Sequence, residues 1–267
     1  MLYAPNTVAL FLADLDLQDY KYSSINSQLS VISYYFRLAH HPDLRKDALI
    51  EKTVVGLKNL DALNGTRQRR PIGKELLHRL ILALNSVCSS VFERLIYKLA
   101  FSLTFHACLR AGEICKTTTL EHTLRIEQLA RETDEPLGVR YTIRFESFKH
   151  SNFRTPSITI QKSQDTVICP VISLDDFFRY LPARTGPILQ FFDGSVMNRY
   201  RLAKKLKEAL DFCGEDSSLY NIHSLRIGRA TQLANDNISD AAIRSAGRWS
   251  SNAYIKYIRP SEFVVPH

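Results

Sequence analysis

HSLR at residues 223–226 and GRWSSNAYIKY at residues 247–257 are the most informative stretches of this sequence. A His and an Arg three residues apart on a helix share one face, so His223 and Arg226 are predicted to lie together. The second stretch adds an indole and ends on Tyr257. Side chains that bind anions or exchange protons thus follow one another over a short segment.

An arginine far upstream completes the set. CLRAGE at 108–113 places Arg110 three residues before an acidic residue, Glu113. A phosphodiester resists nucleophiles because its non-bridging oxygens are negative, so an enzyme must surround the phosphorus with positive charge and hydrogen-bond donors. Arginine suits this task because its planar fork donates two parallel hydrogen bonds to phosphate oxygens. Arg110 and Arg226 are therefore the candidate phosphate-binding pair.

The other residues of the set can supply a nucleophile and proton carriers. A tyrosine phenol, with a pKa of about 10, attacks phosphorus if a neighbour such as His223 takes its proton. The indole N–H of Trp249 donates and never accepts, which suits a phosphate oxygen. Taken singly, each residue has an ordinary explanation as an ion-paired arginine, a core histidine or a packing aromatic. The interpretation depends on the joint pattern.

Composition bounds the class of protein. The 267 residues suffice for two domains, and 45% apolar with 23% charged residues is typical of a soluble globular chain. A net charge of +8 favours an anionic partner without identifying it. Five cysteines without a CxxC pair argue against a disulfide framework and a zinc site. The sequence shows no apolar run near the ~20 residues of a membrane span, no secretory signal and no nucleotide-binding loop.

Hydrophobic periodicity predicts a mainly α protein with a small antiparallel β-sheet. Helices are expected over 7–15, 23–39, 46–63, 74–86, 91–108, 174–181, 195–212, 222–235, 240–246 and 252–258. Strands are expected over 121–128, 139–148 and 157–161, with a hairpin connection over 148–156. The early helices and the later mixed segments indicate two domains of different character.

A basic segment, TRQRRP at 66–71, marks the boundary between these parts. We expect a helical N-terminal domain over 1–66, a basic linker over 67–72 and a second domain over 73–267. The linker is suited either to a path along a phosphate backbone or to a solvated connection.

The quoted motifs resemble those of the tyrosine recombinases, the family of phage integrases, Xer-type recombinases and Cre recombinase. LTFHACLRAGE resembles the first conserved box of that family, and IHSLRIGRAT at 222–231 resembles the second. The succession of CPV at 169–171, HSLRIG, GRWSS and YIRP is most similar to recombinases of eukaryotic mobile elements, the Crypton and DIRS-like groups.

This resemblance implies a helical core-binding domain that clamps DNA and an α+β catalytic domain. It also implies roles for the residues of the set: Arg110 and Arg226 bind the scissile phosphate, Glu113 supports them, His223 is the acid–base group, Trp249 is the indole donor, and Tyr257 attacks the phosphorus to form a 3′-phosphotyrosyl bond. Tyr254 is the alternative nucleophile, and Tyr257 is preferred because Ile-Arg-Pro follows it.

The family places a catalytic lysine in a hairpin turn. Lys149, in FKHS at 148–151, fits that place. Lys162, at the end of the next expected strand, is the alternative, and His150 could contribute. Such a lysine would give a proton to the leaving 5′ oxygen.

The resemblance implies no cofactor and no metal, and the phosphotyrosyl link conserves bond energy, so resealing would need no ATP. The expected partner is double-stranded DNA, bound by a dimer at each recombination site and by a homo-tetramer overall, without membrane or nucleotide. A eukaryotic mobile element would place the protein in the nucleus, and any other source would place it with the nucleoid in the cytoplasm.

Other functions stay open at the level of sequence. A type IB topoisomerase uses the same chemistry without strand exchange, and a catalytically silent relative would bind DNA alone. A basic scaffold that binds only protein would explain the charge but not the order of the motifs.

Overall fold

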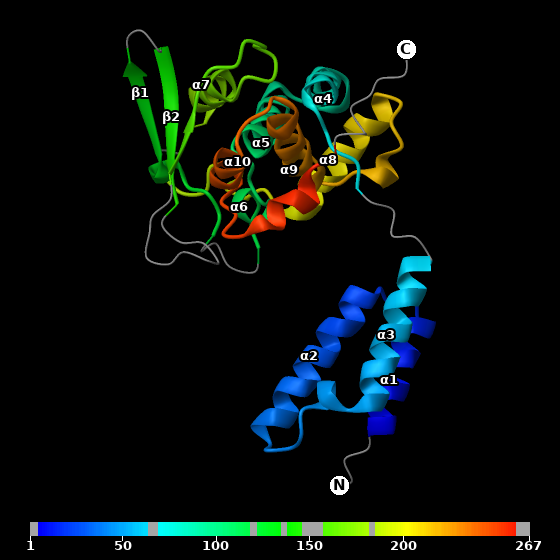
Figure 1. Ribbon diagram of the computed structural model, residues 1–267. Coiled ribbons are helices and arrows are strands. Elements are labelled where there is room, and N and C mark those ends of the chain that lie inside the picture. Colours follow the sequence, from blue (N-terminus) through cyan, green and yellow to red (C-terminus); the bar gives the residue numbers. More distant parts are fainter. Residues whose placement is uncertain are drawn as a thin grey trace. The chain divides into compact units, whose positions relative to one another are not determined.

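A computed structural model of the protein describes residues 5–63, 69–117, 122–134, 138–145, 157–181 and 185–259. The chain divides into two compact units, Met1–Gln68 and Arg69–His267, and each is considered by itself (Figure 1). The described residues are mainly helical with one small antiparallel sheet, which confirms the predicted fold class. In the ranges that the structure describes, no helix combines the length and apolar character needed to cross a membrane.

The N-terminal unit consists of three helices, α1 (Pro5–Leu17), α2 (Tyr22–Leu38) and α3 (Ala48–Leu63). Their apolar stripes meet in a small core that contains Leu12, Ile25, Leu29, Leu44, Ile50 and Leu57. The third helix begins later than expected, because a short 3-10 turn covers Leu44–Lys46 and the Asp47 carboxylate accepts the first free N–H groups of α3.

The C-terminal unit is built around α5 (Val91–His106), the apolar helix at the centre of its core. Figure 1 shows it among α4 (Lys74–Val87), α7 (Pro170–Tyr180), α8 (Arg199–Phe212) and α9 (His223–Asn235). Ten of its residues are buried, so it is enclosed on nearly all sides, as its apolar sequence predicts. The short helices α6 (Ala111–Ile114) and α10 (Asp240–Gly247) follow α5 and α9 along the chain.

One sheet borders the helices, in the order β1 (Leu129–Asp134), β2 (Gly138–Arg144) and β3 (Ser157–Ile160), all antiparallel. The two later strands confirm the prediction, and Tyr141 and Ile143, which share one face of β2, are buried. The strand expected over 121–128 is wrong, because Ile126–Gln128 forms a 3-10 turn. The Gln128 side chain accepts the Arg125 N–H there, which closes the turn before β1 begins.

Three other expected boundaries also move for local reasons. The α7 helix begins four residues early at Pro170, because proline suits the first helical turn. The α8 helix begins only at Arg199, because the Asn198 side chain caps it and residues 195–197 bond to the chain near Leu189 instead. The last expected helix is a 3-10 helix, η4 (Asn252–Tyr257). The expected hairpin connection over 148–156, with Lys149 and His150, lies outside the described residues.

The described end of the basic segment is fixed to the C-terminal unit. The Arg70 N–H donates to the Leu219 carbonyl over 2.9 Å, and the Ile72 N–H donates to the Ser224 carbonyl over 3.0 Å. Ile72 is fully buried, and its backbone lies against Gly228 of α9. Gly228 is thus the point where α9, which carries His223 and Arg226, meets the start of the unit.

Replacing Gly228 with alanine should destabilise the C-terminal unit. The added Cβ would overlap the Ile72 carbonyl oxygen, and backbone on both sides leaves little room to move. We expect the free energy of unfolding to fall by about 3 kcal/mol, the upper range for overpacking. Trp249, the one tryptophan in the chain, reports this transition by its fluorescence during denaturation.

Gly56→Ala is the matched control, because Gly56 also lies inside a helix but has nothing within 4 Å of the added Cβ. Circular dichroism should show the N-terminal unit unchanged or more stable by up to about 1 kcal/mol. Equal effects of the two substitutions would contradict the close packing of α9 on Ile72.

Candidate active site

The Arg226 guanidinium lies at the centre of the predicted site. Arg226 is fully buried, one Nη donates to the Cys108 carbonyl, and the other donates to the Gly247 carbonyl over 2.6 Å. The same side chain therefore joins the chain after α5, the helix α9 and the end of α10. Its Nε has no hydrogen-bond acceptor among the described residues.

Two rings, those of Trp249 and Tyr257, lie over this guanidinium, and the His223 ring packs against Tyr257. We call His223, Trp249 and Tyr257 the aromatic cluster. The Tyr257 ring centre is 5.0 Å from that of His223 and 5.1 Å from that of Trp249. The Arg226 guanidinium carbon is 4.3 Å from the Trp249 ring centre and 5.6 Å from that of Tyr257. Both contacts lie within the range of cation–π attraction. The structure thus brings together four predicted site residues.

Tyr257 is held in this place through its backbone. The Thr231 hydroxyl, fully buried on α9, lies 3.1 Å from the Tyr257 carbonyl and accepts the Arg259 N–H over 3.1 Å. The Ser251 hydroxyl accepts the Ala253 N–H and so begins the 3-10 helix that carries the tyrosine. This helix is tied to α9 directly next to the turn that presents His223 and Arg226.

Tyr254 has a different environment from Tyr257. Its ring is 2% exposed and packs with Leu233 and Ile243 in a small separate core. A hydrogen bond from its hydroxyl to Asp240 is the main cause of a raised pKa of Tyr254. Tyr254 therefore serves packing, whereas Tyr257 is the tyrosine beside His223.

Arg110 lies next to this site and is oriented by Glu113. The Arg110 N–H donates to Glu113 Oε2 over 2.8 Å, and its Nη1 donates to Glu113 Oε1 over 2.9 Å. The Arg110 side chain is 36% exposed, whereas that of Glu113 is 8% exposed. Arg110 is therefore the arginine of the predicted pair that solvent reaches in this conformation.

A residue that the sequence analysis did not assign, Arg248, also belongs to the site. Its side chain is 2% exposed and donates to Glu113 Oε2 over 2.6 Å and to the Ala107 carbonyl over 3.1 Å. It stands directly before Trp249 in the quoted stretch, which was the one available signal. Helical spacing does not predict where the Arg248 side chain points, because the backbone of Arg248 has a left-handed conformation.

The charge balance at this point is strongly positive. Arg226, Arg248, Arg229 and Glu113 all act on the buried Cys108 thiol, whose pKa is raised by burial. Burial by itself raises the pKa of Glu113, but the charge of Arg248 and the bonds from Arg110 outweigh it and hold the pKa below its ordinary value. The Glu113 carboxylate is thus ionised, and it offsets only part of the arginine charge.

His223 is neutral at pH 7 in this environment. Burial, followed by the charges of Arg226 and Arg110, lowers the pKa of His223 from 6.5 to about 4. A neutral imidazole has a free nitrogen that accepts a proton. The ring beside Tyr257 is therefore in the form required of a general base.

The two lysine candidates differ in what the structure describes. Lys149 lies outside the described residues. Lys162 is exposed, two residues beyond β3. Among the described ranges, no group of three or more His, Cys, Asp and Glu side chains could hold a metal ion.

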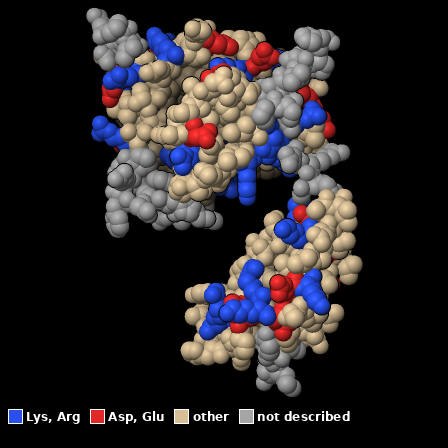
Figure 2. Space-filling view, viewed as in Figure 1, with Lys and Arg blue, Asp and Glu red and all other residues tan. Residues whose placement is uncertain are grey.

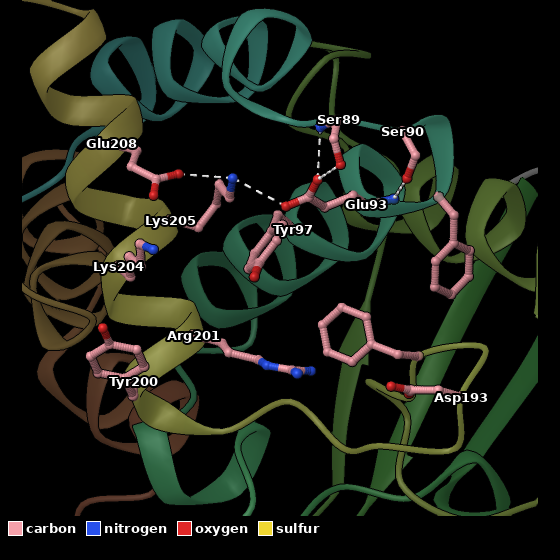
Figure 3. Close-up of a pocket in the computed structure, with 12 residues that line it drawn as sticks. Ser89, Ser90, Glu93, Tyr97, Asp193, Tyr200, Arg201, Lys204, Lys205 and Glu208 are labelled. Carbon is pink, nitrogen blue, oxygen red and sulfur yellow. Dashed lines mark hydrogen bonds and ion pairs between the residues drawn. The ribbon is translucent and has the colours of Figure 1, made fainter.

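Two further surfaces differ in character from the predicted site. Basic and acidic side chains are mixed on the face shown in Figure 2, so the net charge does not form one uniform patch there. Figure 3 shows a groove between α5 and α8 whose charges are largely paired, since Lys205 contacts Glu93, Glu208 and the Val87 carbonyl. The groove is a second concave surface, lined by none of the predicted site residues.

Comparison with known proteins identifies solved structures of similar fold. No family model matches the chain, and none of the curated proteins matches it. Solved structures do match: the Tn1549 transposon integrase in complex with circular intermediate DNA (TM-score 0.63, 10% identity, 98% of this chain and 82% of that chain) and a lambda integrase dimer bound to a COC' core site (0.61, 16%, 96% and 65%). The XerH site-specific recombinase bound to difH substrate also matches (0.54, 17%, 91% and 68%).

The chain has the fold of the tyrosine recombinases. It spans 65% of the lambda integrase chain and 50% of the XerH chain in a post-cleavage complex, so the activity of those longer chains is not assigned by the fold alone.

The Thr231 hydroxyl is expected to stabilise the backbone position of Tyr257. Thr231→Val keeps the shape but leaves the Arg259 N–H without its acceptor. The loss of this partly buried hydrogen bond should lower the free energy of unfolding by about 1 kcal/mol, measured by Trp249 fluorescence. Thr231→Ser retains the hydroxyl and should remain closer to the wild type. A Val variant as stable as the Ser variant would argue against this tether.

The neutral state of His223 can be tested by titration. NMR should show its ring protons titrating near pH 4, with His223→Gln used to identify the signal. Because the folded pKa lies below the unfolded one, the associated stability is present above pH 6.5 and is lost as the pH falls toward 4. Arg110→Gln should raise the midpoint, since the Arg110 charge contributes to the shift. A midpoint at 6.5 in both proteins would refute the buried cationic environment.

Proposed function

We propose that the protein is a site-specific DNA recombinase that cuts and rejoins DNA through Tyr257. The observation that carries this proposal is the aromatic cluster beside Arg226. In it, the ring centre of the Tyr257 phenol lies 5.0 Å from that of the neutral His223 imidazole. The fold shared with recombinases that were solved on DNA supports it.

Unpaired donors in the cluster support an anionic ligand. Trp249 Nε1 and Arg226 Nε are buried and have no acceptor among the described residues. Buried donors are nearly always paired, so such groups call for an explanation, and a bound ligand is one. A phosphate would satisfy both donors and offset the excess arginine charge. Arg110, with its partly exposed side chain, would hold the same group from the solvent side.

In the proposed reaction, a DNA phosphoryl group is transferred from the 5′ oxygen to the tyrosine hydroxyl. Tyr257 Oη attacks the phosphorus, and its proton passes to the free nitrogen of His223. The bond from phosphorus to the 5′ oxygen breaks, and Lys149, or Lys162 in its place, gives that oxygen a proton. A 5′ hydroxyl from another strand then attacks the phosphotyrosyl bond and reverses these steps, so the sequence of bonds needs no ATP.

The resting arrangement of the aromatic cluster must open before this reaction can begin. Arg226 is fully buried and both its Nη groups donate to carbonyls, so a phosphate reaches it only if Trp249 and Tyr257 shift. Glycine at 247 permits their packing, because a Cβ there would overlap the Trp249 ring. We infer that DNA binding opens the aromatic cluster and presents Tyr257 to the phosphate.

The wider setting rests on the sequence resemblance. The Crypton- and DIRS-like motifs favour a mobile-element recombinase that acts in the nucleus, as a dimer on each site and a tetramer in the complete complex. The N-terminal helical domain over 1–66 would clamp double-stranded DNA. The Tn1549 integrase, a transposon protein of the same fold, is consistent with this setting.

Covalent trapping on nicked duplex DNA tests the nucleophile. Wild-type protein should form an adduct that survives a denaturing gel, and Tyr257→Phe should abolish it because the attacking oxygen is gone. Tyr254→Phe, three residues away and in the separate core, should retain adduct formation. An adduct that disappears with Tyr254→Phe but persists with Tyr257→Phe would exchange the two assignments.

The same assay separates the two alternative functions. Relaxation of supercoiled plasmid without strand exchange would favour a type IB topoisomerase. DNA binding without any adduct would favour a catalytically silent relative.

A further inference from the structure

We propose that Arg248 is a positioning residue for the cleavage reaction, because it fixes Glu113 and, through it, the guanidinium of Arg110. This inference depends on the proposed function for its catalytic meaning, but the contacts that carry it belong to the resting protein. The quoted motif places Arg248 next to Trp249 and assigns it no role.

The backbone at Arg248 shows that the side chain is held in place by its surroundings. Arg248 ends α10 in a left-handed conformation, with φ 54° and ψ 45°. Glycine or asparagine is usual at such a position, because a side chain with a Cβ is disfavoured there. An arginine that is 8% exposed at this point must be stabilised by its contacts.

Those contacts join three parts of the site. Arg248 donates to the Ala107 carbonyl over 3.1 Å and to the Cys108 carbonyl over 3.4 Å, at the end of α5. Its guanidinium carbon lies 4.4 Å from the ring centre of Phe145, which follows β2. The third contact is the 2.6 Å ion pair with Glu113.

Glu113 is a bridge between two guanidinium groups. Its Oε1 accepts from Arg110 Nη1 over 2.9 Å, while its Oε2 accepts from Arg248 over 2.6 Å and from the Arg110 N–H over 2.8 Å. A carboxylate held by both oxygens cannot rotate freely. The orientation of the partly exposed Arg110 is thus set by a buried residue more than 130 positions away along the chain.

Charge gives Arg248 a second effect on Arg110. If Glu113 had Arg110 as its one partner, the pair would be neutral and would attract a phosphate weakly. With Arg248 included, the three residues carry one net positive charge, and Arg110 is the member of the three whose side chain solvent reaches. Arg248 therefore keeps Arg110 both oriented and available to an anion.

A double-mutant cycle tests the coupling. In single-turnover adduct formation with saturating full-length protein, Arg248→Met should be slower by about 100-fold, the cost of a small misplacement of a catalytic group. Arg110→Ala should lose at least as much, and the double variant should be no slower than Arg110→Ala, because Arg248 acts through Arg110. Arg244→Met, on the same helix, is the matched control and should leave the rate unchanged. Losses that multiply in the double variant would overturn the proposal.

Conservative variants separate position from stability. Arg248→Lys keeps the charge and loses the fork, so we expect a partial loss of rate. Adding Glu113→Gln to Arg248→Met removes the buried negative charge that has lost one of its two arginine partners, and should raise the unfolding temperature without restoring the rate. Recovery of both would mean that Arg248 serves stability alone. If Arg248→Met does not fold, these two variants carry the test.

A second readout does not need cleavage. The Arg110 Nε–H signal in ¹⁵N NMR, identified by its loss in Arg110→Lys, should broaden or shift in Arg248→Met and stay unchanged in Arg244→Met. If the wild type forms no adduct, the proposed function fails, and this measurement still shows whether Arg248 holds Arg110. An unchanged Arg110 signal in Arg248→Met would refute the positioning role.

Discussion

The site depends on a buried arginine bonded to backbone carbonyls. Arg226 donates to the carbonyls of Cys108 and Gly247, and Arg248 donates to those of Ala107 and Cys108. Carbonyls at a helix end have no partner within the helix and carry the negative end of its dipole, so cations are stabilised there. The end of α5 thus gives both arginines a common anchor, which brings α9 and α10 to the same point. Loss of this anchor would separate the end of α5 from α9 and α10, which carry the other motifs of the site.

The anchor also determines protonation in the site. Burial of the imidazole, followed by the nearby charges of Arg226 and Arg110, lowers the pKa of His223, so His223 stays neutral beside Tyr257. The same surplus of positive charge would stabilise a phosphate and the negative charge that develops as the phosphate is attacked. One arrangement therefore explains both the state of the base and the preference for an anion.

Much of the fold and the cluster could be predicted from the sequence, because they follow from local patterns. Helical spacing gave α5 and α9, alternation gave β2 and β3, and the separation of His223 from Arg226 placed both at one end of α9. Contacts that depend on tertiary structure could not be predicted. The role of Arg248 follows from a left-handed residue whose side chain crosses to another segment, and the position of β1 follows from a side-chain cap at Arg125.

The complete burial of Arg226 could not be predicted from the sequence either. It means that the proposed mechanism requires the site to open before a phosphate binds. A guanidinium under two rings gains cation–π attraction of about 1–2 kcal/mol for each contact when desolvated. Charge-assisted bonds to a phosphate are roughly twice as strong as neutral ones, so in the proposed reaction a phosphate would compensate for the ring contacts that it displaces. The bond from Thr231 would hold the backbone of Tyr257 during this exchange. The ring could then turn toward the phosphorus while the residue stays beside His223, so one side chain would both cover the resting site and act as the proposed nucleophile.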